Sequence, residues 1–130
     1  MNTETEKEKR SKKLLSISRA GETDDLVAIA MVAYIKADDD YSLICCVNGR
    51  KVLVPETIGS LLIQIEDREC YDFVRISRSV AVNINHAHGI SKDMIWVNDT
   101  YFYMTGKYKK AVRDLIIPLK RIRKRKTGDD

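Results

Sequence analysis

The stretch "YSLICCVNGRKVLV", residues 41–54, contains the clearest folding signal in this chain of 130 residues. Two apolar runs flank the pair Asn48 and Gly49. An Asn-Gly pair in this setting predicts a β-hairpin, because both residues tolerate the left-handed backbone conformation that a tight turn needs. The stretch therefore predicts two antiparallel strands, and it makes a β-rich fold the starting expectation.

Short strands are also predicted on both sides of this hairpin. On its N-terminal side, "LLSI" at 14–17 predicts a strand, "ETDD" predicts a turn, and "LVAIAMVAYIKA" at 26–37 predicts one or two strands that end at Asp38–Asp40. On its C-terminal side, "VND" at 97–99 predicts a second hairpin turn. Five further segments predict strands: "DFVRI", "SVAVNI", "GISKD", "MIWV" and "YFYMT".

Two helices are expected. Pro55 and Glu56 suit the first turn of one helix, whose apolar residues recur at helical spacing: Ile58, Leu61, Leu62 and Ile65. The other helix runs from about Lys107 to Ile116, and Pro118 ends it because proline clashes with the preceding turn. The expected apolar face of this second helix consists of Ala111, Val112, Leu115 and Ile116.

The expected fold class is mainly β, with roughly eight to ten short strands, one internal helix and one C-terminal helix. A chain of this length forms one domain with one core. Residues 1–13 carry little besides charged and polar groups and are expected to form a disordered arm. The folded domain is expected at 14–118, followed by a basic tail at 119–130.

The composition, 44% hydrophobic and 32% charged, is ordinary for a globular protein. No apolar run approaches the roughly 18 residues of a membrane span, and the N-terminus lacks the apolar stretch of a signal peptide. We therefore expect a cytoplasmic protein without membrane insertion. Cys45, Cys46 and Cys70 lack the spacing of metal or redox motifs, which predicts buried thiols.

The positive charge is concentrated at the C-terminal end. Residues 107–130 hold ten Lys or Arg against three Asp, whereas residues 14–106 hold eight basic against thirteen acidic residues. A polyanion would therefore be met mainly from one side. The basic run from Lys120 to Lys126 has two interpretations: a solubilising end, or a segment that follows the phosphate backbone of a nucleic acid.

No motif of enzymatic chemistry is present in the sequence. His86 and His88 lack a nucleophile or a set of metal ligands nearby. The carboxylates of Asp38–Asp40 are consecutive, so they diverge and lack the alternating spacing of a calcium loop. No glycine-rich loop precedes a helix to hold a phosphate. We therefore expect neither an enzyme, nor a cofactor, nor a metal site.

The segment "RISRSVAVNI", residues 75–84, combines an apolar pattern with a polar front. Its apolar residues recur at even positions, as on one face of a strand: Ile76, Val80, Val82 and Ile84. Its front holds two arginines and two serines: Arg75, Ser77, Arg78 and Ser79. These residues form either a solvated strand end or a surface that meets an anion.

Three segments in order, "VAYIKADDDYSLICCVNGRKVLV", "FVRISRSVAVNINH" and "YFYMTGKYKKAV", closely resemble the LytTR DNA-binding domain. The resemblance runs from about residue 13 to 118 and has a helix between the first and second segments. It implies an elongated stack of β-sheets that reads double-stranded DNA with loops instead of a recognition helix. The implied function is a bacterial, sequence-specific transcription regulator whose loops enter successive major grooves.

The resemblance also implies three groups of DNA-binding residues. The first group would enter one major groove: Asp40, Tyr41 and Ser42. In the second, Arg75 would meet the backbone, and a rigid strand would aim Arg78 and Ser79 at phosphates or at the intervening minor groove. The third group would lie at a second major groove: Thr105, Lys107 and Lys110.

Members of this family are usually preceded by a phosphorylated receiver domain, whereas only the 13-residue arm precedes the domain here. The resemblance therefore implies a stand-alone regulator, controlled by abundance, by an inhibitory or sensor protein partner, or by homodimerisation on direct repeats. An alternative stays open: a protein-interaction module that pairs with and titrates a full-length relative. The carboxylates of Asp38–Asp40 favour this alternative, and the arginines and the basic end favour DNA binding.

Overall fold

The computed structural model describes residues 13–18 and 24–116 of the chain. The described residues form ten strands in three sheets, two α-helices and two short 3-10 helices, so the predicted mainly β fold is confirmed. The central sheet is antiparallel with the strand order β5-β4-β3-β7-β6. Its strands are β3 (Val32–Asp38), β4 (Tyr41–Cys46), β5 (Lys51–Val54), β6 (Phe73–Ser77) and β7 (Val80–Asn83).

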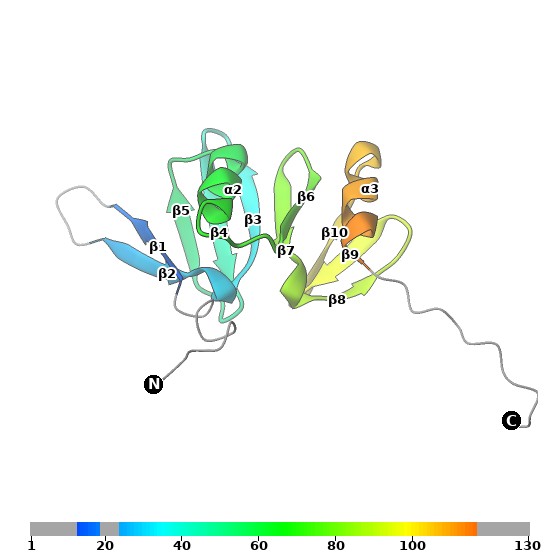
Figure 1. Ribbon diagram of the computed structural model, residues 1–130, viewed down its shortest axis with the longest axis horizontal. Coiled ribbons are helices and arrows are strands. Elements are labelled where there is room, and N and C mark those ends of the chain that lie inside the picture. Colours follow the sequence, from blue (N-terminus) through cyan, green and yellow to red (C-terminus); the bar gives the residue numbers. More distant parts are fainter. Residues whose placement is uncertain (1–12, 19–23, 117–130) are drawn as a thin grey trace, which may run out of the picture.

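One face of the central sheet is covered by the β1–β2 pair and by helix α2 (Figure 1). Their bounds are β1 (Leu14–Ile17), β2 (Asp25–Ala28) and α2 (Ile58–Glu66). The first core cluster fills this layer, with Leu15 from β1, Ile44 from β4 and Ile65 from α2 all buried. Burial of these apolar side chains supplies the main stabilisation of this half of the molecule.

The opposite face is covered by a three-stranded sheet of order β10-β9-β8 and by helix α3 (Figure 1). These elements are β8 (Ala87–Ile90), β9 (Met94–Val97), β10 (Thr100–Tyr103) and α3 (Gly106–Leu115). The second core cluster joins Ile76 and Val82 of the central sheet to Ile95 of β9 and Val112 of α3. The chain length predicted one core, whereas the structure has two core clusters, one on each face of the central sheet, and these lie along the long axis of the molecule.

The two predicted hairpin turns are confirmed. Strands β4 and β5 pair with Cys45 opposite Lys51, and Gly49 in the connecting turn has a φ of +92°. Only glycine adopts such a backbone without strain, which explains the strength of the sequence signal. The second turn joins β9 to β10, and there Asn98 has a φ of +56°.

The segment 75–84 folds back on itself instead of forming one strand. Arg78 and Ser79 form a two-residue turn between β6 and β7. A bulge between Arg75 and Ser77 adds one residue to β6, and Ile76 lies in the same core cluster as Val80. The even-numbered apolar pattern therefore predicted burial correctly. Arg78 and Ser79, however, lie in a hairpin turn and not on the single rigid strand that was expected to aim them.

The helix predictions need two corrections. Helix α2 starts at Ile58, after Pro55 and Glu56, because the Thr57 hydroxyl oxygen accepts a 3.1 Å hydrogen bond from the Ser60 N–H and caps the helix there. On α3, Val112 is buried, whereas Ala111 and Leu115 are exposed. The helix enters the second core cluster with Val112, and Ile116, the residue directly after the helix, packs against the same cluster.

The remaining expectations concern the ends of the chain, the cysteines and membrane insertion. Pro118, most of the N-terminal arm and the basic tail lie outside the described residues. Within them, the thiols of Cys45 and Cys46 are buried and unbridged, and Cys70 is buried as well. In the same part of the chain, neither helix has the length and apolar composition needed to cross a bilayer.

Candidate nucleic-acid interface

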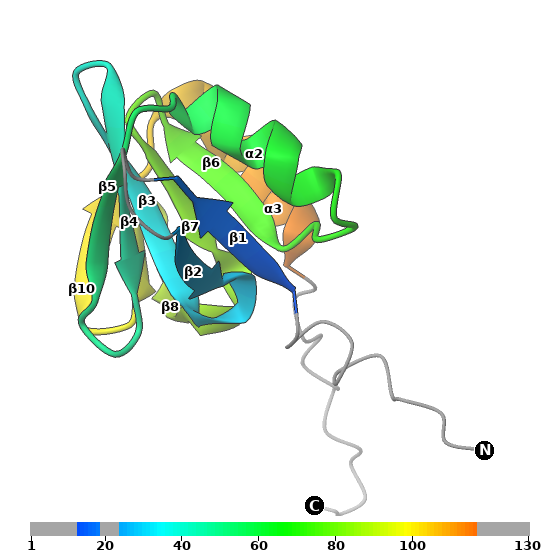
Figure 2. The same cartoon turned by 90° about the vertical axis from the view of Figure 1, so that its left-hand side faces the viewer.

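Three segments that are far apart in sequence meet at one edge of the molecule. The N–H of Ala37, near the end of β3, donates a 2.8 Å hydrogen bond to the carbonyl of Ser79 in the β6–β7 turn. The N–H of Thr105, directly before α3, donates a 3.0 Å hydrogen bond to the carbonyl of Ile76 at the end of β6. Figure 2 shows the β3–β4 turn, the β6–β7 turn and the first turn of α3 at the same end of the strands. These three segments are called the upper edge below.

The β3–β4 turn carries acidic and aromatic groups into solvent. Asp38 pairs with Tyr41 across the turn, and Asp39 has a φ of +56°, a conformation that aspartate tolerates better than most residues. The Asp40 side chain is exposed, and Tyr41 is 46% exposed. Ser42 is fully buried, and its hydroxyl donates a 2.6 Å hydrogen bond to the Glu56 carbonyl. Ser42 therefore anchors the turn and presents no side chain at the upper edge.

The β6–β7 turn exposes one cation and one hydroxyl. The side chains of Arg78 and Ser79 are exposed, and the Ser79 N–H donates a 3.3 Å hydrogen bond to the Ser77 hydroxyl oxygen. Arg75 is different, because its guanidinium Nη2 donates a 2.6 Å hydrogen bond to the carbonyl of Arg78. Arg78 is thus available to an anion, whereas Arg75 is engaged within the protein.

The start of α3 combines free backbone donors with exposed lysines. Thr105 occupies the N-cap position without a side-chain capping bond, and of the first-turn N–H groups that of Tyr108 donates a 2.9 Å hydrogen bond to the Thr105 carbonyl. The N–H groups of Gly106 and Lys107 receive no such cap and can meet an acceptor. Such groups attract phosphates and other anions. Lys107 is exposed, with its Nζ 5.2 Å from the ring centre of Tyr108. The Lys110 side chain is 84% exposed and lies 3.3 Å from the carboxylate of Asp114 one turn later.

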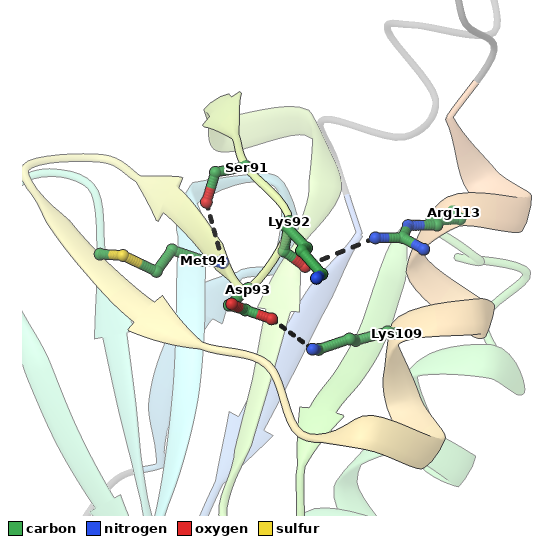
Figure 3. A network of polar contacts seen from close by, with 6 residues as sticks. All are labelled: Ser91, Lys92, Asp93, Met94, Lys109 and Arg113. Atoms are coloured by element: carbon green, nitrogen blue, oxygen red, sulfur yellow. Dashed lines mark hydrogen bonds and ion pairs between the residues drawn. The ribbon is translucent and has the colours of Figure 1, made fainter.

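Two other basic residues of α3 face the protein (Figure 3). Lys109 forms an ion pair with Asp93, in the loop between β8 and β9, and Arg113 donates a 3.4 Å hydrogen bond to the carbonyl of Lys92. The hydrogen bond and charge of Lys109 lower the pKa of the Asp93 carboxyl. Lys109 and Arg113 therefore hold α3 against the β8–β9 loop. The sequence alone gave no signal for this clamp, because its partners are far apart along the chain.

Seven of the nine residues implied by the resemblance have exposed side chains at the upper edge: Asp40, Tyr41, Arg78, Ser79, Thr105, Lys107 and Lys110. The other two, Ser42 and Arg75, make internal hydrogen bonds there. Contact of any of these residues with DNA stays a prediction. Within 13–18 and 24–116, no group of three or more potential metal ligands is present.

Comparison with known proteins identifies a family and a similar solved structure. The model of the LytTr DNA-binding domain matches residues 25–117. A solved structure, the LytTr DNA-binding domain of a protein described as a methyl-accepting/DNA response regulator from Bacillus cereus, has a similar fold. Its TM-score is 0.64 at 18% sequence identity, over 80% of this chain and 96% of that chain. The search of curated proteins gave no match. The family model covers most of the sequence, and the chain therefore belongs to the LytTR family of DNA-binding domains.

Proposed function

We propose that this protein is a transcription regulator that binds specific sequences of double-stranded DNA with its upper edge. The observation that supports this proposal is the grouping of the three exposed segments at that edge by two backbone hydrogen bonds. In the proposed complex, the β3–β4 turn and the start of α3 enter successive major grooves. The β6–β7 turn lies between them.

The chemistry of the segments suggests a division of roles. Arg78 and Ser79 offer a cation and a hydroxyl to phosphates, and phosphate contacts fix the position and register of a protein on DNA. Lys107 and Lys110 offer exposed cations in the first two turns of α3, and Thr105 and Tyr41 offer hydroxyl groups. Contacts to base edges in the major groove would then supply the sequence preference.

A gel-shift titration with a randomised duplex library at low salt, followed by selection of the bound DNA, tests this proposal. The informative variant is Arg78→Ala with Lys107→Ala. Its matched control is Lys51→Ala with Arg68→Ala, which also removes two exposed cations but away from the upper edge. We expect the first variant to lose binding and the control to retain it. Absence of any shift with the wild-type protein at low salt would contradict DNA binding.

A second candidate function is supported by the acidic β3–β4 turn. The side chains of Asp38, Asp39 and Asp40 are all exposed there, and three carboxylates repel the phosphates of DNA. In this alternative the domain acts as an interaction module that pairs with and titrates a full-length relative. Co-purification with such a relative, together with no gel shift, would favour it.

In the first function, two copies of the protein would bind adjacent direct repeats, and a sensor or inhibitory protein would control access of the protein to its DNA sites.

A further inference from the structure

Arg75 has an unusual position for a basic residue next to a proposed DNA contact. It lies on β6 opposite Ala81, on the face of the central sheet that α2 covers, and it is half-buried. Its Nη2 donates to the Arg78 carbonyl at 2.6 Å. A Cβ atom at Gly59, in the first turn of α2, would be 4.0 Å from Nη1 of Arg75. The guanidinium thus lies between the start of α2 and the β6–β7 turn.

We propose that Arg75 is a positioning residue, which holds the β6–β7 turn in the shape that presents Arg78 to DNA and does not itself contact the duplex. This inference rests on the proposed function, because it concerns how Arg78 reaches a phosphate. It also replaces the role that the family resemblance implied for Arg75, which was contact with the DNA backbone.

The geometry of the guanidinium supports this role. A bidentate contact with a phosphate uses two parallel N–H groups, either Nε with one Nη or the two Nη atoms. In Arg75 the Nε atom is buried without a hydrogen-bond partner among the described residues, and Nη2 is bonded to the Arg78 carbonyl. Neither pair of donors is therefore free to form a bidentate contact with a phosphate. Arg78 has no such internal bond in the described structure, and its side chain is exposed.

The β6–β7 turn is held from two sides. Arg75 binds the carbonyl of Arg78 from the α2 side, and the Ala37 N–H binds the carbonyl of Ser79 from β3. Two consecutive carbonyls are thereby fixed, which restricts the backbone dihedral angles between them. Loss of the Arg75 guanidinium would free one carbonyl and let the Arg78 side chain sample other directions.

A double-mutant cycle separates positioning from direct contact. The variants are Arg75→Met, Arg78→Ala and the combination, titrated with a fluorescent random duplex of about 20 base pairs, two helical turns, at several salt concentrations. We expect Arg75→Met to weaken binding roughly three- to tenfold. Because Arg75 acts through Arg78, Arg75→Met should lower neither the affinity nor the salt slope any further in a protein that already carries Arg78→Ala. The salt slope of the combination should therefore fall by only about 0.9.

Two outcomes of the cycle would overturn the inference. A salt slope lower by about 1.8 in the combination would mean that Arg75 meets its own phosphate. Multiplied losses of affinity in the combination would mean that Arg75 contributes independently of Arg78, as a general effect on folding would. Failure of the wild-type protein to bind any duplex would instead overturn the proposed function, and this inference with it.

A measurement on the wild-type protein covers the case in which Arg75→Met does not fold. The Nε–H signals of both arginines can be followed by NMR as the duplex is added. We expect the Arg78 signal to shift strongly and the Arg75 signal to stay in place, protected from exchange with water. A strong shift of the Arg75 signal, with Arg78 unchanged, would overturn the assignment.

Discussion

The backbone N–H of Thr105 donates a 3.0 Å hydrogen bond to the carbonyl of Ile76, joining the start of α3 to the end of β6. One residue further along the chain from Ile76 lies Ser77, and then the exposed turn of Arg78 and Ser79. The hydrogen bond therefore sets the separation between the cation of that turn and the lysines of α3. In a protein that binds a regular duplex, this separation decides whether both can reach DNA together.

Lys107→Ala and Lys109→Ala should differ in effect although the residues are two positions apart. Lys107 is exposed at the start of α3, so its loss should weaken binding to all duplexes and lower the salt slope by about 0.9. Lys109 is paired with Asp93, so its loss should lower the melting temperature and leave the salt slope unchanged. Salt-dependent titrations and thermal unfolding of both variants check this. Equal loss of salt slope in both variants would be inconsistent with the observed clamp.

The ion pair of Asp93 with Lys109 predicts a pH-dependent contribution to stability. The hydrogen bond from Lys109 lowers the folded-state pKa of Asp93 below its ordinary value of 3.8. A lowered folded pKa means stabilisation that is fully present above the unfolded-state pKa and is lost as the pH falls through the folded-state pKa. The melting temperatures of the wild type and of Asp93→Asn should therefore differ at neutral pH and become equal in strong acid. A difference in melting temperature that widens in acid would contradict this role of the Asp93–Lys109 pair.

Removal of the carboxylates in the β3–β4 turn should strengthen DNA binding. Asp39→Asn with Asp40→Asn keeps the size of both side chains, and asparagine also tolerates the left-handed φ of position 39. With less repulsion of phosphates, affinity for random duplexes at low salt should rise by about two- to fivefold. Fluorescence titration measures the change. Unchanged binding would indicate that this turn is far from the phosphates, and weaker binding would indicate that the carboxylates themselves contribute to the contact with DNA.

Gly59→Ala should stabilise the protein without affecting DNA binding. Gly59 lies in the first turn of α2, where alanine is favoured over glycine by about 0.5–1 kcal/mol. The added methyl group would lie 4.0 Å from both Arg75 Nη1 and Thr57 Oγ1, which is ordinary contact. Urea unfolding should show the gain in free energy of unfolding. Weaker DNA binding in this variant would mean that the methyl group moves Arg75 and the turn that it holds.

Local signals predicted the hairpin turns and most strands, although the predicted strand "GISKD" at 89–93 overlaps only the end of β8 (Ala87–Ile90). The Asn48-Gly49 pair and the alternation of Val80 and Val82 depend on neighbouring residues only, and the structure confirms both. The buried face of α3 was less predictable, because apolar Ala111 and Leu115 turn away from the core that Val112 enters. Which apolar residues of a short helix are buried depends on the surface that it meets.

The state of individual site residues depended on contacts between distant parts of the chain. Ser42 is withdrawn from the surface by the carbonyl of Glu56, fourteen residues later, and Lys109 is occupied by Asp93, sixteen residues earlier. No local pattern encodes such pairs. The resemblance therefore implied three segments that the structure brings together at the upper edge, but the sequence could not separate exposed side chains from those with internal partners.

The most direct test of the account is to map the DNA-contacting surface by NMR. Backbone amide shifts would be followed as a duplex of about 20 base pairs is added at low salt. We expect strong shifts at residues 38–41, 78–79 and 105–110. We expect little change at the turns 47–49 and 98–99, which line one cavity at the opposite end. Strong shifts at those two turns, together with unchanged amide signals at the upper edge, would contradict DNA binding by the upper edge.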